Sequence, residues 1–90
     1  MATGHCKLVV DGHTFDGFRL ALETDRSPAH GLLTGPVEPL KAAHRTRWAK
    51  VELNRGILID IGVLQVNDTG MAFIILGVDT LPEILKDLAP

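Results

Sequence analysis

Turn signals recur at short intervals along the chain, and this spacing limits the fold more than any other feature. They lie at residues 11–12, 16–17, 35–36, 54–56 and 67–70, and each combines glycine with Asp, Asn or Pro. The runs between them have the length of β-strands. This pattern is typical of antiparallel hairpins that close into a sandwich or a barrel.

Six segments are predicted to be strands, because apolar and polar side chains alternate along several of them. Phe18, Leu20 and Leu22 share one face of the second, and Ile59 and Ile61 share one face of the fifth. The six strands are predicted at residues 7–10, 15–23, 30–34, 48–53, 57–66 and 71–78. We therefore predict an all-β, mainly antiparallel fold, a small six-stranded β-barrel or sandwich.

A C-terminal helix is predicted to follow the last strand. Residues 80–83, Thr-Leu-Pro-Glu, form a capping box with proline in the first turn. Four apolar residues then recur at helical spacing: Leu81, Ile84, Leu85 and Leu88. Two turns of helix are not stable alone in water, so we expect this stripe to dock on the sheet.

Two smaller features of the chain carry expectations of their own. Pro36 and Pro39 interrupt the middle, so residues 41–45 are expected to form a single helical turn or an irregular crossover. Gly62 weakens the interior of its strand and is expected to mark a bulge or a bend.

Length and composition limit the class of protein. Ninety residues form one domain, residues 1–90. With 46% apolar and 22% charged residues, the chain is too hydrophobic for intrinsic disorder. The longest apolar run, residues 71–78, is too short to span a bilayer, and we recognise no secretory signal. We expect a cytoplasmic protein with no membrane insertion.

No arrangement of residues indicates catalysis, a metal or a cofactor. The histidines, His5, His13, His30 and His44, lack the spacing of metal ligands. The single cysteine, Cys6, has no partner for a disulfide and is expected to fill space in the core. One Trp, three Phe and no Tyr fall in core-like patterns, which argues against stacking on nucleic acid. We expect a non-enzymatic protein.

Residues 25–31, Asp-Arg-Ser-Pro-Ala-His-Gly, connect the second strand to the third. A strand, then Asp-x-Ser, then a glycine that opens a strand resembles the PilZ domains, bacterial receptors for cyclic di-GMP. The layout of the C-terminal half, with its turn at 67–70, is similar as well. The alternative interpretation is an ordinary polar turn in which Asp25 or Ser27 accepts backbone N–H groups.

The resemblance implies a ligand site, but two features of the family's motif differ in this sequence. It would place cyclic di-GMP at Arg26, Ser27 and Gly31, with Arg45 and Arg47 supplied by the basic segment 41–55. The family's glycine stands one residue earlier than Gly31, and its arginine pair is absent before the first strand. Those arginines stack on guanine and pair with phosphates. The chain therefore resembles degenerate members that act through protein partners.

Three functions remain open at this point. The first is a PilZ-like module for protein–protein interaction in regulation or assembly, with a protein partner or a homo-oligomer. The second is a receptor domain for cyclic di-GMP, and the third is a structural subunit of a larger assembly such as a phage or secretion particle. The interface is predicted at Met71, Phe73, Leu81, Ile84, Leu85 and Leu88. The alternative interpretation is that this stripe is simply the hydrophobic core.

Overall fold

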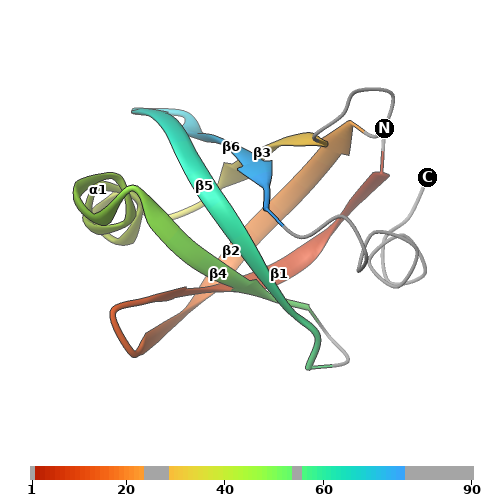
Figure 1. Cartoon of the computed structure of the whole chain (residues 1–90), viewed down its shortest axis with the longest axis horizontal. Helices are drawn as coiled ribbons and strands as arrows, with labels where there is room; N and C mark the ends of the chain where they lie inside the picture. The colour runs from red at the N-terminus through yellow and green to blue at the C-terminus, as the bar shows by residue number, and fades with distance from the viewer. Residues whose placement is uncertain (1, 24–28, 54–55, 77–90) are drawn as a thin grey trace.

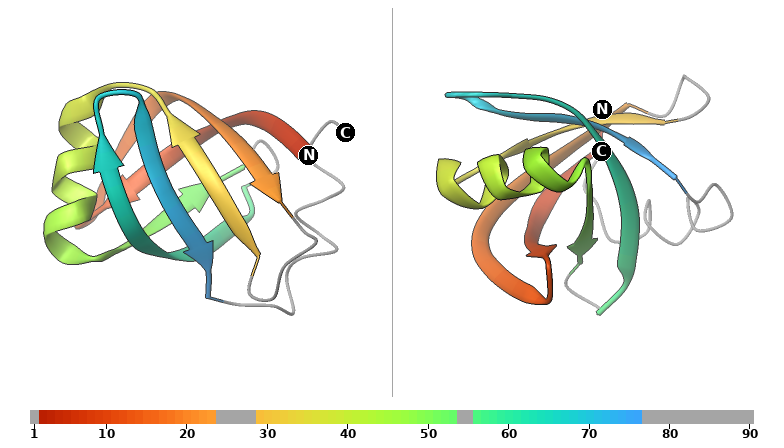
Figure 2. Two further views of the ribbon diagram at one scale, coloured as in Figure 1. Left: turned by 90° about the horizontal axis from the view of Figure 1, so that it is seen from above. Right: turned by 60° about the vertical axis from the view of Figure 1, so that its left-hand side comes forward.

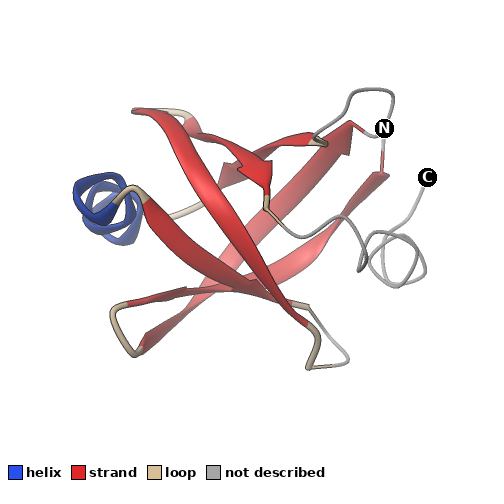
Figure 3. Cartoon of the chain, in the orientation of Figure 1, coloured by secondary structure: helices blue, strands red, loops and turns tan. Residues whose placement is uncertain are grey.

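Six strands and one helix make up the part of the chain that the computed structural model describes, residues 2–23, 29–53 and 56–76 (Figures 1 and 3). In chain order they are β1 (Ala2–Val10), β2 (His13–Glu23), β3 (His30–Thr34), α1 (Val37–Thr46), β4 (Trp48–Glu52), β5 (Leu58–Asn67) and β6 (Gly70–Ile75). The predicted all-β class is confirmed. The predicted helix after residue 79 lies outside the described residues.

The strands close on themselves in the order β1-β2-β3-β6-β5-β4, with β4 paired to β1. Every neighbouring pair is antiparallel. The structure is therefore a closed barrel, in which each of the six strands pairs with two neighbours over at least part of its length.

Two of the predicted turns have the local chemistry that a tight reversal needs. Asp11 and Gly12 join β1 to β2 with φ of 51° and 81°, the left-handed pair typical of a two-residue hairpin. Between β5 and β6, the side-chain oxygen of Asn67 accepts hydrogen bonds from the backbone N–H groups of Thr69 (2.9 Å) and Gly70 (3.0 Å). The oxygen thereby accepts hydrogen bonds from backbone N–H groups that have no partner strand within the turn.

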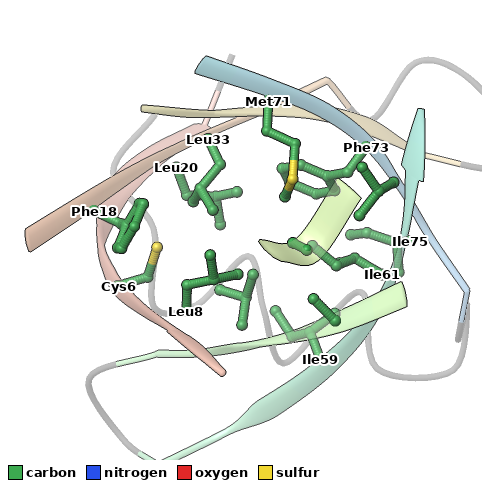
Figure 4. Close-up of a cluster of buried hydrophobic side chains, with 14 of the residues drawn as sticks. Cys6, Leu8, Phe18, Leu20, Leu33, Ile59, Ile61, Met71, Phe73 and Ile75 are labelled. Carbon is green, nitrogen blue, oxygen red and sulfur yellow. The ribbon is translucent and has the colours of Figure 1, made fainter. Parts of the chain in front are cut away.

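The core fills the barrel with side chains from every strand (Figure 4). The alternation predicted for β2 and β5 is confirmed, because Phe18, Leu20, Leu22, Ile59 and Ile61 are all at most 2% exposed. The remaining buried side chains are Cys6, Leu8, Val10, Ala29, Leu33, Leu40, Ala43, Ala49, Val51, Leu53, Val63, Met71, Phe73 and Ile75. No polar or charged residue of the described chain is buried with them.

Helix α1 is longer than the single turn expected from the sequence, and the two prolines explain the difference. Pro36 is the N-cap residue and Pro39 lies in the first turn, where a helix has no use for the missing N–H. The prolines therefore begin the helix instead of breaking it. Leu40 and Ala43 are buried in the core cluster, so α1 closes one end of the barrel (Figure 2).

Two strands differ from their predicted form. Strand β1 begins at Ala2 instead of residue 7, because residues 2–6 pair with the second half of β2. The irregularity expected at Gly62 lies nearby, where the register of β5 against β6 shifts between Val63 and Gln65. An extra residue at this position bends the strand and increases its twist.

Candidate functional site

Apolar side chains on the outer surface of five neighbouring strands form what we call the apolar wall, which runs around much of the closed barrel. Side chains that alternate with core residues point outward from neighbouring strands β2, β3, β6, β5 and β4. The apolar wall consists of Ala21, Leu32, Trp48, Leu58, Gly62, Leu64, Ala72, Ile74 and Leu76.

All the exposed large hydrophobic side chains of the described residues lie on this wall. They are Leu32 (44% exposed), Trp48 (47%), Leu58 (49%), Leu64 (48%) and Leu76 (51%). Single exposed leucines are ordinary on a protein surface. Leu32 and Leu64 stand on either side of Ala72, on the strands that flank β6, and both line the same hollow.

A shallow hollow of about 270 Å³ lies in the middle of the wall. Small residues, Ala21 and Ala72, alternate across the strands with the larger Leu32 and Leu64, because Leu32 pairs with both alanines. Its lining residues are Ala21, Glu23, His30, Gly31, Leu32, Leu64, Ala72 and Phe73. This relief gives an apolar partner side chain a place to insert.

Trp48 forms the β4 edge of the wall. Its partner across the ladder is Gly62, and Gly62 in turn pairs with Ile74. The ammonium group of Lys50 lies 5.7 Å from the centroid of the Trp48 ring and 4.0 Å from the carboxylate of Asp60. The aromatic edge is thus bordered by charge, as the rim of a protein interface is.

The outer surface of β1 and the first half of β2 has the opposite character. His5, Lys7, Thr14 and Asp16 are exposed there, and Lys7 lies 3.6 Å from Asp16. The exterior of β1 and the first half of β2 is therefore polar, and we call it the polar side.

A second concave surface of about 260 Å³ separates α1 from the β5–β6 turn. It is lined by Val37, Lys41, His44, Arg45, Val66, Asn67 and Asp68. Three of these are basic and lie on one face of α1, near the negative end of the helix dipole, which cations stabilise. Asp68 stands opposite and offsets part of their charge.

The predicted ligand residues are not all gathered at one place. Gly31 lies near the start of β3, whereas Arg45 and Arg47 lie at the end of α1, on the side of the barrel where β3 has already ended (Figure 2). Arg26 and Ser27 lie outside the described residues. Within the described chain, Gly31 and the two arginines therefore do not form one site.

The packing around Gly31 gives this residue a structural role. A Cβ added there would meet the ring of Phe73 and would lie 3.0 Å from the backbone oxygen of Ala21. A glycine is thus required for the ring to pack, independently of any ligand.

The predicted interface requires a correction on its described part. Met71 and Phe73 are 0% and 1% exposed and belong to the core, so they cannot contact a partner of the folded barrel. The strand that holds them does reach the surface, through the alternate residues Ala72 and Ile74. Leu81, Ile84, Leu85 and Leu88 lie outside the described residues.

Sequence reasoning missed Leu32, Leu64 and Trp48. The signal for Trp48 was ambiguous, because the predicted strand 48–53 allowed either Trp48 or Ala49 to face the core. The structure buries Ala49 (1% exposed) and turns Trp48 outward. Leu58 and Gly62 lie on the face of their strand opposite to the core residues. An apolar side chain such as Leu58 on that outward face was the sequence signal that could have indicated the wall.

The described residues provide little for catalysis. Burial raises the pKa of the Cys6 thiol to about 12, so it is protonated and a poor nucleophile at neutral pH. Over residues 2–23, 29–53 and 56–76, no three His, Cys, Asp or Glu side chains are grouped to hold a metal ion. In the same ranges, no helix has the length and hydrophobicity needed to span a membrane.

Comparison of the chain with models of known protein families, with curated proteins and with solved structures gives no match.

Proposed function

We propose that this protein is a non-catalytic interaction module that binds a protein through the apolar wall. The observation behind this proposal is that the exposed large hydrophobic side chains of the described residues all come from four consecutive strands or their ends, β3, β6, β5 and β4: Leu32, Trp48, Leu58, Leu64 and Leu76. Each Å² of apolar surface removed from water contributes about 25 cal/mol, so covering these side chains is favourable.

The composition of the wall supports a protein as the occupant. Leu32, Ala72 and Leu64 form an uncharged row across β3, β6 and β5, whereas Glu23 borders the hollow and Lys50 pairs with Asp60 beside Trp48. Interfaces between proteins are likewise depleted of charge at the centre, enriched in aromatic residues and polar at the rim. A large aromatic side chain such as Trp48 is the residue type that most often dominates binding energy.

We also propose, from the resemblance of residues 25–31, that the barrel is a degenerate PilZ-like domain with a role in regulation or assembly. The departures in the sequence favour a protein partner over the nucleotide. The position of Gly31 on β3, away from the arginines at the end of α1, also favours a protein partner. Cyclic di-GMP is a compact dianion, and it would need its arginine partners close together.

A receptor role for cyclic di-GMP is the alternative that the basic residues of α1 favour. Isothermal titration of the full chain with cyclic di-GMP, repeated on Arg45→Ala, separates the two functions. We expect no heat of binding from either protein. Micromolar or tighter binding that weakens in Arg45→Ala would establish the alternative.

The interaction itself is tested by placing a photo-activated cross-linking amino acid at position 64, in the cells that make the protein. The control is the same group at position 14, on the polar side. We expect covalent adducts from position 64 and none from position 14, identified by mass spectrometry. The adducts should disappear when Leu32→Asp is added. Equal adducts from both positions, or none from either, would contradict the proposal.

A further inference from the structure

We infer that the groove between α1 and the β5–β6 turn is a binding site for the terminal phosphate group of a small phosphorylated molecule. The groove shares no residue with the apolar wall, so the inference goes beyond the proposed function and does not depend on it. Three observations lead to it: the unpaired basic side chains of α1, the orientation of one amide in the turn, and the size of the groove.

Helix α1 lines the groove with three basic side chains. Lys41, His44 and Arg45 are three and four residues apart, so they share the face of the helix that borders the β5–β6 turn (Figure 2). The ion pairs of the described residues lie elsewhere, on the polar side and beside Trp48, so none of these three side chains is in an ion pair there. Their N–H groups are therefore available to an anionic ligand.

The side-chain amide of Asn67 adds a fourth donor. Its Oδ1 accepts from the backbone N–H groups of Thr69 and Gly70 and from the Thr69 hydroxyl, at 2.9, 3.0 and 2.6 Å. Because these hydrogen bonds occupy the oxygen, the free end of the amide is Nδ2, which carries two N–H donors. No described residue accepts from Nδ2, and Asn67 lines the groove.

The dipole of α1 explains only part of this arrangement. His44 and Arg45 are in the last turn of the helix, where its partial negative charge favours basic residues. This effect falls off within one turn, so it does not account for Lys41 in the middle of the helix or for Asn67 on another element. The feature that all four side chains share is the groove.

The charge of the groove suits a terminal phosphate. Lys41 and Arg45 supply two positive charges and Asp68 one negative charge, whereas Glu38 of the same helix does not line the groove. A terminal phosphate carries about −1.5 to −2 charges at pH 7 and three acceptor oxygens for the donors. A phosphodiester, as in cyclic di-GMP, has one charge and two free oxygens, so it matches the donors less well.

The size of the groove limits the rest of the ligand. Its volume is about 260 Å³, and Val37 and Val66 supply the apolar part of its lining. Sites for small molecules usually have volumes of about 300–1,000 Å³, so this groove is near the lower limit. It suits a phosphate that carries a small organic group, with the valines in contact with the carbon atoms.

NMR titration of the full chain with methyl phosphate tests the inference, and dimethyl phosphate is the control because it is the corresponding diester. At pH 7 and constant ionic strength, we expect methyl phosphate to cause saturable shifts with a dissociation constant in the millimolar range. The largest shifts should be those of the Asn67 side-chain amide and the backbone amide of Asp68. Dimethyl phosphate should cause no shifts at the same concentration.

Three variants assign the binding to the groove. Arg45→Gln removes a charged donor and should weaken methyl phosphate binding about tenfold. Asp68→Asn removes the opposing carboxylate and should strengthen it about threefold. Lys7→Gln, on the polar side, is the control and should leave it unchanged. Arg45 and Asp68 are both exposed, so neither variant should disturb the fold, and their opposite effects could not come from a loss of folding.

The contrary results are equally distinct. An Asn67 side-chain amide that does not shift with methyl phosphate would overturn the inference. So would equal shifts with the two esters, or equal weakening in Arg45→Gln and Lys7→Gln, because the anion would then respond only to the overall charge of the protein. None of these results bears on the apolar wall, which cross-linking from position 64 tests separately.

Discussion

Gly31 leaves room for the ring of Phe73 in the barrel core. Replacing it with alanine places a methyl group within 2.9 Å of the ring atom Cε2 and 3.0 Å from the backbone oxygen of Ala21. The ring has to shift in a close-packed core, so we expect Gly31→Ala to lower the free energy of unfolding by about 1–3 kcal/mol.

Denaturant unfolding measures this loss, and Phe73→Leu provides the control. In the double variant Gly31→Ala with Phe73→Leu the ring is absent, so the two losses should not add. Additive losses would show that Phe73 is not the group that requires glycine at this position.

Cys6 makes the stability of the fold depend on alkaline pH. Its thiol ionises near pH 9 in the unfolded chain and near pH 12 in the barrel, because burial disfavours the thiolate. Between these values the unfolded state loses a proton that the folded state keeps. The free energy of unfolding should therefore fall as pH rises above about 9, by about 1.4 kcal/mol per pH unit from this group.

The measurement is denaturant unfolding from pH 7 to pH 11, compared with Cys6→Ala. The variant retains every other titrating group, so its stability should fall less steeply above pH 9. Identical slopes for the two proteins would refute the assignment to Cys6.

Helix α1 ends with a non-glycine residue in the left-handed conformation. Arg47 has φ of 62°, and its N–H donates to the oxygen of Ala43 at 2.9 Å. A residue with a Cβ is strained there, whereas glycine is not. We expect Arg47→Gly to raise the free energy of unfolding by about 0.5–1 kcal/mol.

Arg45→Gly is the matched control, because residue 45 lies within the helix. Glycine in a helix interior costs about 1 kcal/mol, so this variant should be less stable than the original protein. A pair of thermal unfolding curves decides the question, and the same sign of change in both variants would contradict it.

At the scale of the whole molecule, the barrel is expected to open first between β1 and β4. The Cα register there includes only Lys7–Glu52, Leu8–Val51 and Val9–Lys50, the shortest ladder of the barrel. Fewer paired residues mean a lower free energy of local opening. Amides of this seam should exchange with solvent about tenfold faster than those shared by β5 and β6, which corresponds to about 1.4 kcal/mol.

Native-state hydrogen exchange followed by NMR resolves this order residue by residue. The β5–β6 amides serve as the internal reference, since that ladder is one of the longer ones. Slower exchange at β1–β4 than at β5–β6 would show that α1, which packs against β1 and β4, holds the seam closed.

Local sequence patterns were enough to predict the strand content, the tight turns and most of the core, because these depend on neighbours within a few residues. Alternation identified Phe18, Leu20 and Leu22 as buried, and Asp11–Gly12 as a hairpin turn. The tertiary structure alone decided which strands meet. It closed the barrel, placed α1 across one end and separated Gly31 from the arginines of α1. The apolar wall depends on the same contacts, because Leu32, Leu64 and Trp48 come from three strands that only long-range pairing brings together.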